Sequence, residues 1–167
     1  NLFNTQFFLV IIKYMKKMID EKVVICIGSN INAHSNIIIA MELLAGEVEV
    51  IDCSRFYLTN PVGKREQPDF INGACLVKTH ISPYELKFGF LYEIERILGR
   101  VRSDDKNAPR EIDLDIILYG DQIIDEEGIT IPDPGLFEYP FVAIPVRELV
   151  GNILIPGTTI QLNELFP

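Results

Sequence analysis

The stretch "APREIDLDIILYGD" at residues 108–121 combines an apolar strand with charged side chains at its entrance. Asp113 and Asp115 alternate with apolar residues, and Arg110 stands just before them. Side chains two residues apart in a strand point to the same face of a sheet. The pattern therefore predicts a strand with one face that presents both carboxylates and one face that packs on the core. The core face is expected to consist of Ile112, Leu114, Ile116 and Leu118.

Two carboxylates this close repel each other, which raises their pKa values unless a cation lies between them. A hard divalent ion such as Mg²⁺ suits oxygen ligands and commonly arrives with phosphate groups. An arginine beside such a pair suits a polyphosphate, because its guanidinium group binds phosphate oxygens in a fixed geometry. The alternative is the solvated outer face of an edge strand. Arg110 favours the metal and polyphosphate interpretation.

The loop at 100–109, directly before this strand, is rich in cations. Together with Arg110, its Arg100, Arg102 and Lys106 place four cations within eleven residues of a chain whose net charge is −9. An ordinary polar loop is the alternative, but next to two aspartates the pattern favours an anion clamp. Because this loop has little apolar surface to bury, we expect it to be mobile without ligand and to close over a bound triphosphate.

A second group of residues lies upstream, in "FYLTNPVG" and "QPDFING". Phe70 and Asn72 share one face of a predicted strand, where an aromatic ring and an amide suit a flat heterocycle. The backbone of 59–62, irregular because of Pro61, could add further hydrogen-bonding groups. The alternative is a core phenylalanine and a turn asparagine. "GSN" at 28–30 follows the first predicted strand and by itself is typical of a helix cap.

Composition limits the class of protein. The 167 residues, with 48% hydrophobic and 23% charged, predict a single globular domain. The net charge of −9 argues against a general nucleic-acid surface. Three cysteines without a CxxC pattern are expected to be reduced core residues of a cytoplasmic protein, and two histidines are too few for a histidine-rich metal site.

The N-terminal segment contains the apolar run "FFLVII", which is too short to span a bilayer. Its lysines follow the run instead of preceding it, which argues against a signal peptide. We expect residues 1–21 to form a leader outside the domain and 22–167 to form one domain. The alternative is an extra element packed on that domain.

The predicted elements follow the order β-α-β-β-α-β. They are strands at 22–28, 47–59, 69–80 and 110–120, and helices at 37–46 and 82–99. This order is the split βαβ plan of ferredoxin-like α+β folds, an antiparallel sheet with helices packed on it. A C-terminal extension follows, with a Pro-rich loop, a short helix at 141–149 and one further helical turn.

The chain resembles the 6-hydroxymethyl-7,8-dihydropterin pyrophosphokinase family of folate biosynthesis. The resemblance extends from about residue 22 to 165, and "PR-x-x-D-L-D" is its most specific motif. The matching blocks are "GSN", "FYLTNPVG", "QPDFINGA", "GRVR", "APREIDLDIILYGD" and "TIPDP…PFVAIPVREL".

The resemblance implies transfer of the β,γ-pyrophosphate of ATP to the pterin hydroxymethyl group, with release of AMP. It implies that Asp113 and Asp115 hold two Mg²⁺ ions and that Arg100 and Arg110 assist transfer. It further implies a cytoplasmic monomer that binds neither membrane nor nucleic acid. The implied nucleotide contacts are Glu95, Arg102, Arg110, Ile116 and Thr130. The implied pterin contacts are Thr59, Asn60, Val62, Phe70, Asn72 and Phe141.

The chain departs from the family pattern near the triphosphate. Asp133 stands where the family often has histidine, "EYP" at 138–140 lacks a common arginine, and Asn107 replaces an aromatic residue of some members. Two other functions therefore stay open. One is a non-catalytic ferredoxin-like ligand-binding module, and the other is a different Mg²⁺-dependent phosphoryl or nucleotidyl transferase.

Overall fold

The structure is a computed structural model that describes residues 20–64, 66–102, 105 and 107–167. Residues 1–19 of the predicted leader lie outside this range, so the leader and the domain boundary stay predictions. In the described part of the chain, no helix is both long and apolar enough to cross a membrane.

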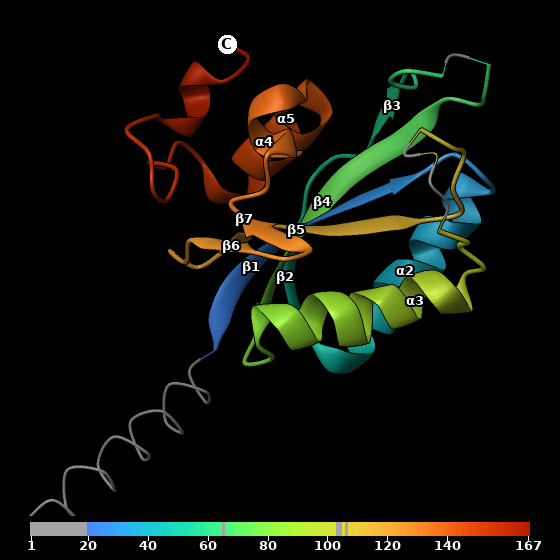
Figure 1. The fold of residues 1–167 in the computed structure, drawn as a ribbon, viewed down its shortest axis with the longest axis horizontal. Coiled ribbons are helices and arrows are strands. Elements are labelled where there is room, and N and C mark those ends of the chain that lie inside the picture. The colour runs from blue at the N-terminus through green and yellow to red at the C-terminus, as the bar shows by residue number, and fades with distance from the viewer. Residues whose placement is uncertain (1–19, 65, 103–104, 106) are drawn as a thin grey trace, which may run out of the picture.

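Five strands in the described residues form one sheet, in which every pairing is antiparallel. The order is β2-β4-β1-β5, and the short β3 also pairs with β4 (Figure 1). The predicted α+β class with an antiparallel sheet is thus confirmed. The strands are β1 (Glu21–Ser29), β2 (Glu49–Cys53), β3 (Tyr57–Thr59), β4 (Phe70–Thr79) and β5 (Asp113–Tyr119).

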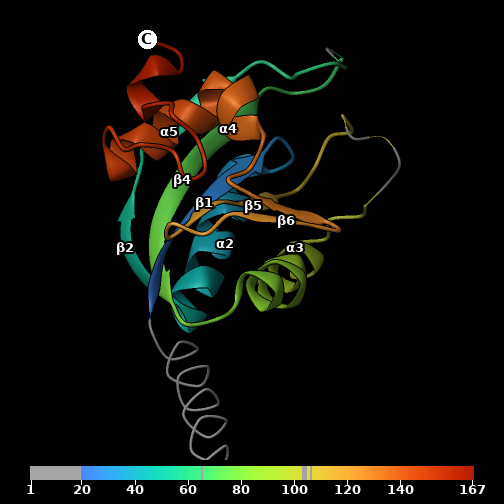
Figure 2. The same ribbon diagram turned by 60° about the vertical axis from the view of Figure 1, so that its left-hand side comes forward.

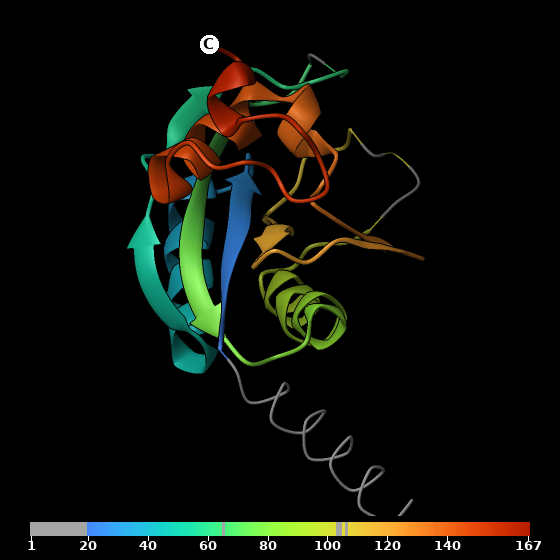
Figure 3. The ribbon, with the colours of Figure 1, turned by 90° about the vertical axis from the view of Figure 1, so that its left-hand side faces the viewer.

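Helices cover both faces of the sheet (Figures 1 and 2). On one face lie α2 (Ala33–Glu47) and a helix whose first part is π-helical, η1 (Glu85–Leu91), and whose second part is α3 (Tyr92–Ile97). On the other face lie α4 (Gly135–Glu138), α5 (Pro140–Val150) and the 3₁₀ turn η2 (Leu162–Glu164) (Figure 3). The core is accordingly divided into two apolar clusters, one on each face.

A two-stranded hairpin follows β5 and was not predicted. It consists of β6 (Ile124–Glu126) and β7 (Ile129–Ile131). Ile129 and Ile131 are buried in the same apolar cluster as α2 and α3. The sequence signal for this hairpin is weak, because each strand has only three residues and the acidic stretch "DEEG" separates their apolar residues.

Three predicted elements differ in their bounds. The first helix begins at Ala33, ahead of the predicted 37–46. The predicted strand at 47–59 is divided into β2 and β3. Ser54 lies at the break, where its hydroxyl accepts the Ala74 N–H at 2.9 Å and donates to the Arg55 carbonyl at 2.8 Å. The segment predicted as loop at 131–140 contains α4.

One face assignment was wrong. Leu118 packs in the cluster with α5, whereas Ile112, Leu114 and Ile116 pack in the cluster with α2 and α3. The cause is a β-bulge: Val24 pairs with Leu118 but Ile25 pairs with Ile116, so one residue of β5 is extra and the alternation reverses there. The face assignment therefore holds only up to Ile116.

The prediction that the cysteines are core residues holds for only part of the set. Cys75 on β4 is buried and Cys26 on β1 is partly buried, but Cys53 is exposed. Cys53 lies on β2, the strand at the edge of the sheet. An edge strand has a neighbour on one side only, which accounts for this exposure.

Candidate active site

Two adjoining cavities meet at the carboxylates of β5. The first, of about 260 Å³, lies between the sheet and the segment of α4 and α5. The second, of about 500 Å³, lies beside η1, α3 and the segment that leads to β5. Asp113, Asp115 and Arg110 line both. A ligand in one cavity therefore reaches the same charged residues as a ligand in the other.

The first cavity gathers residues that are distant in the sequence. The six residues predicted to contact the pterin all line it, namely Thr59, Asn60, Val62, Phe70, Asn72 and Phe141. The Asn72 amide nitrogen donates to the Thr59 hydroxyl at 2.7 Å, which orients the amide. Gly28 pairs with Asn72 across the sheet, and a Cβ at Gly28 would lie 2.5 Å from the Asn72 amide oxygen. A larger residue at position 28 would therefore have to displace the Asn72 amide.

Aromatic rings form two walls of this cavity. Phe141, at the start of α5, stacks on Tyr139 with ring centroids 5.0 Å apart and planes inclined by 17°. Phe70, at the start of β4, lies with its ring centroid 5.9 Å from the Arg110 guanidinium carbon. Sequence reasoning did not assign Tyr139 to the site, because it was recognised only as a departure from the family pattern.

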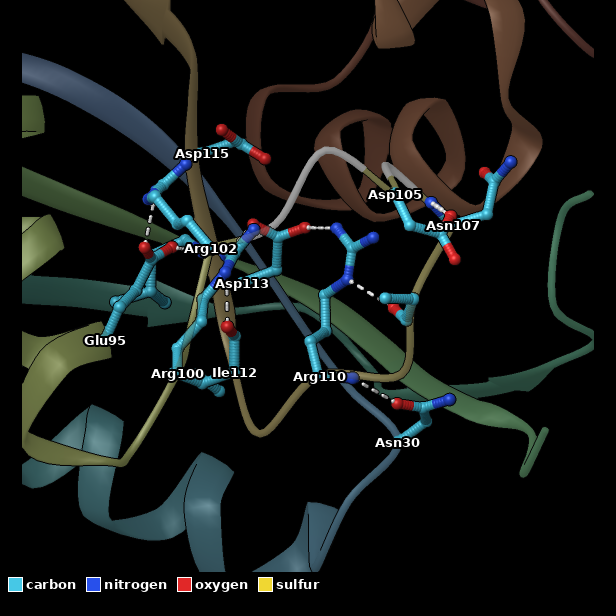
Figure 4. Close-up of polar contacts among 12 residues, drawn as sticks. Asn30, Glu95, Arg100, Arg102, Asp105, Asn107, Arg110, Ile112, Asp113 and Asp115 are labelled. Atoms are coloured by element: carbon cyan, nitrogen blue, oxygen red, sulfur yellow. Dashed lines mark hydrogen bonds and ion pairs between the residues drawn. The ribbon is translucent and has the colours of Figure 1, made fainter. Parts of the chain in front are cut away.

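Ion pairs between arginines and the carboxylates of Asp113 and Glu95 lie at the second cavity (Figure 4). Arg100 and Arg110 both donate to the Asp113 carboxylate. Arg100 also contacts Glu95 at 2.6 Å and the Ile112 carbonyl at 3.1 Å. Arg102 contacts Glu95 at 2.5 Å. Arg100 and Arg110 thus reach the predicted Asp113, whereas Arg102 reaches Glu95.

Glu95 is buried on α3, with only 2% of its side chain exposed. Burial raises the pKa of its carboxyl group, and the charge of Arg100 opposes that rise. Its Oε1 also accepts the Leu114 N–H at 3.0 Å. Glu95 therefore anchors α3 to β5 and fixes two arginines in the cavity.

Asp115 has a more distant cation than Asp113: the Lys87 ammonium lies 3.8 Å from its carboxylate. Burial, followed by the charge of Asp113, raises the pKa of Asp115 to about 7. Even so, 43% of the side chain is exposed, so a ligand can reach it. Burial also raises the pKa of Asp133, which lines the first cavity.

The raised pKa of Asp115 predicts how pH affects the stability of the protein when no metal is added. A carboxyl group with a higher pKa in the folded than in the unfolded chain stabilises the fold at low pH. That contribution is lost as the pH rises from the ordinary value of 3.8 to about 7. We therefore expect Asp115→Asn to raise the melting temperature of EDTA-treated protein more at pH 8 than at pH 5. Calorimetry at both pH values checks this, and an equal gain at both would contradict the assignment.

The structure reveals one polar cluster that sequence reasoning missed. Asn30 is buried and accepts the Arg110 backbone N–H at 2.8 Å. Its amide nitrogen donates to the Gln67 side chain and to the Pro68 carbonyl, both at 3.0 Å. The helix-cap interpretation of "GSN" was wrong, since Asn32 is the N-cap of α2. Asn30 instead ties the segment before β5 to the segment before β4.

Two residues predicted to contact nucleotide lie away from this cluster. Ile116 is buried in the core, on the face opposite Asp115, and Thr130 lies on β7, opposite Asp125. Neither is among the described residues that line the two cavities. Within the predicted clamp at 100–109, residues 103, 104 and 106 lie outside the described part of the chain. The contribution of Lys106 and closure of the clamp therefore stay predictions.

The residues present suit a magnesium ion that binds together with a substrate. Among the described residues, no group of three or more carboxylates, imidazoles or thiols is arranged to hold a metal. Mg²⁺ is commonly held by one or two carboxylates plus substrate phosphates and water. A carboxylate pair next to arginines and an aromatic pocket is what an enzyme needs to move phosphate groups onto a flat organic substrate. The site thus defines the class of phosphate-group transferases.

Comparison with known proteins identifies the family. Residues 24–151 match the family model of 7,8-dihydro-6-hydroxymethylpterin-pyrophosphokinase, and the chain belongs to this family. The family prediction from the sequence is therefore confirmed, and with it the enzyme class, a pyrophosphokinase.

The similar proteins include both short and long chains. A 2-amino-4-hydroxy-6-hydroxymethyldihydropteridine pyrophosphokinase of Haemophilus influenzae is 34% identical over 146 residues, which cover 84% of this chain and 88% of the relative. The protein of the same name from Synechocystis sp. is 38% identical, over 83% of this chain and 70% of the relative. The folic acid synthesis protein fol1 of Pneumocystis carinii is 36% identical over 93% of this chain. The match spans only 21% of that protein's length.

Proposed function

We propose that this chain transfers the β,γ-pyrophosphate of ATP to the hydroxymethyl group of 6-hydroxymethyl-7,8-dihydropterin and releases AMP, as a step of folate biosynthesis. The observation that carries this proposal is the meeting of the two cavities at Asp113 and Asp115. One cavity offers aromatic walls and amides for a pterin, and the other offers cations for a triphosphate. An acceptor hydroxyl in the first cavity then faces a phosphorus atom in the second.

The first cavity supplies binding and orientation. Phe70 and Phe141 suit the two faces of a pterin ring, whose heteroatoms require hydrogen-bonding partners. Asn72 and Thr59 are already joined by a hydrogen bond, so their remaining donors and acceptors are held in place. This arrangement limits the freedom lost when the pterin binds, which favours affinity.

The second cavity supplies charge neutralisation. Asp113 and Asp115 would hold Mg²⁺, which would neutralise the negative charge of the ATP phosphates. We propose that two ions bind together with ATP. Arg100 and Arg110 hold Asp113 and lie beside the place where the transferred group must pass. Phosphoryl transfer depends mainly on positioning and charge stabilisation, and we assign no residue here as an obligatory base. Nucleotide contacts by Glu95, Arg102, Ile116 and Thr130 are part of the same proposal.

We also infer that the sheet has the ferredoxin-like plan. The first strand lies between the third and the last strand of the predicted β-α-β-β-α-β order, which is what two interleaved split βαβ units require. In the structure, the predicted second strand corresponds to β2 and β3, and the predicted third strand to β4. A monomer that acts in the cytoplasm remains our expectation.

The close approach of Gly28 to the Asn72 amide gives a prediction for pterin binding. Alanine there would displace the Asn72 amide, because its Cβ would lie 2.5 Å from the amide oxygen. We expect Gly28→Ala to raise the pterin Kd about tenfold, which corresponds to the loss of one oriented hydrogen bond. Fluorescence titration with the pterin measures this. Gly46→Ala is the matched control, since no atom lies within 4 Å of its added Cβ; equal affinities of the two variants would refute the role given to Gly28.

Product analysis tests the proposed function against its two alternatives. The protein is incubated with ATP, Mg²⁺ and 6-hydroxymethyl-7,8-dihydropterin, and nucleotides are separated by chromatography. We expect AMP to form only when all three are present. ADP would indicate a different phosphoryl transfer, and binding of the pterin without any nucleotide product would indicate a ligand-binding module.

A further inference from the structure

The π-helical segment η1 places a lysine in the second cavity that sequence reasoning did not assign. Only 14% of the Lys87 side chain is exposed, and its ammonium lies 3.8 Å from an Asp115 oxygen. It lines the cavity together with Tyr92, Arg100 and Arg102. Lysine is seldom this buried unless its charge is compensated, so its position at the carboxylates requires an explanation.

The π-helical turn accounts for how Lys87 reaches this position. The Tyr92 N–H donates to the Lys87 carbonyl, five residues back, as in a π-helix. In an α-helix, side chains five residues apart point about 140° away from each other. The wider π turn reduces this angle, so that Lys87 and Tyr92 both line the cavity. Single π turns inside helices are frequently found at functional sites.

The cations of this cavity differ in how firmly they are held. Arg100 and Arg102 contact Glu95 at 2.6 and 2.5 Å, and Arg110 donates to Asp113. Lys87 lies 3.8 Å from Asp115, which is longer than a hydrogen bond. It also interacts electrostatically with Asp133. An ammonium on a flexible four-carbon stem can change partner without breaking a short hydrogen bond to Asp115.

We propose that Lys87 is a further phosphate-binding residue of this enzyme, which neutralises Asp115 before the substrates bind and contacts the β- or γ-phosphate of ATP afterwards. This inference rests on the proposed function, because it assigns Lys87 to the nucleotide of that reaction. A metal ion on Asp115 would repel the ammonium, and the phosphate oxygens of the same nucleotide would offer it a new anionic partner in the cavity. No covalent step is involved.

Nucleotide binding by a charge-deleted variant tests the inference. Calorimetric titrations with ATP and with AMP, both with Mg²⁺, are compared for the wild type and Lys87→Met. We expect the Kd for ATP to rise about tenfold, as for a lost hydrogen bond to a charged group, and the Kd for AMP to change less than about twofold. Lys87→Arg keeps the charge and is expected to retain most of the ATP affinity.

Lys78→Met is the matched control. Lys78 lies near the C-terminal end of β4, whereas Phe70 at the N-terminal end lines the first cavity. The Lys78 ammonium pairs with Asp20 at 3.2 Å, and 41% of the side chain is exposed. Its removal should leave both nucleotide affinities unchanged. Thermal melting of every variant establishes that each is folded at the titration temperature.

Two results would overturn the inference. One is unchanged ATP affinity in Lys87→Met, and the other is an equal loss of ATP and AMP affinity, which would show a structural role only. The proposed function is judged separately on the wild type. If the wild type forms AMP while Lys87→Met binds ATP normally, only the role of Lys87 fails; if the wild type binds ATP but forms no AMP, the proposed function fails.

Discussion

Asp113→Ala and Asp115→Ala are each expected to lower kcat by about a thousandfold or more. Each change removes one of the two carboxylates that would hold magnesium at the junction of the cavities, and metal-based charge stabilisation contributes several kcal/mol to such reactions. Pterin binding should persist, because the other residues of that cavity are intact. Initial rates over a magnesium titration measure the loss.

Asp121→Ala provides the control for this pair of variants. Asp121 is an exposed residue in the turn that follows β5, so its removal deletes one carboxylate close to the strand but outside the cavities. Its rate should equal that of the wild type. Near-normal magnesium-dependent turnover in either Asp113→Ala or Asp115→Ala would refute the assignment of the metal ligands.

Arg100→Met is expected to lower both activity and stability. The Arg100 and Glu95 side chains are 11% and 2% exposed, so the substitution leaves a buried carboxylate without one of its cations. Breaking a buried pair in this way costs about 3 kcal/mol of unfolding free energy. The rate should fall at least about a hundredfold, since Arg100 also contacts Asp113. Urea unfolding and initial rates measure the two effects.

Two further variants separate stability from catalysis. Arg102→Met removes the other cation on Glu95, but 49% of Arg102 is exposed, so its cost in stability should be much smaller. Combining Arg100→Met with Glu95→Gln removes both buried charges and should restore much of the stability without restoring the rate. Recovery of activity in the double variant would show that Arg100 acts only through folding.

The fold was predictable wherever the pattern is local. The alternation in β5, the start and stop signals around 82–99 and the loop at 60–68 are all read from neighbouring residues. The bulge that reverses Leu118 depends on pairing with Val24, and the hairpin β6–β7 depends on packing of Ile129 and Ile131. Apolar periodicity predicts a helix at 82–99 but does not distinguish π-helical from α-helical hydrogen bonding, and so Lys87 was missed.

The site residues, like the fold, were predictable where the signal is local in the sequence and not where it depends on distant contacts. The six residues that we propose contact the pterin line one cavity, and Arg100 and Arg110 meet at Asp113, because each lies in a recognisable block of sequence. Asn30 could not be found, because its partner Arg110 is 80 residues away and the bond uses a backbone N–H that any residue would supply. Ile116 and Thr130 had been assigned through the family resemblance alone, and their nucleotide contacts stay proposals.

Isotopic labelling of ATP tests the central claim most directly. The protein is incubated with Mg²⁺, 6-hydroxymethyl-7,8-dihydropterin and ATP labelled with ³²P at either the α- or the β-phosphorus, and the label is followed by chromatography. If the acceptor in the pterin cavity attacks the β-phosphorus at Asp113 and Asp115, the β label appears in the pterin product and the α label in AMP. Recovery of the β label in ADP, or of the α label in the pterin product, would contradict pyrophosphoryl transfer by this chain.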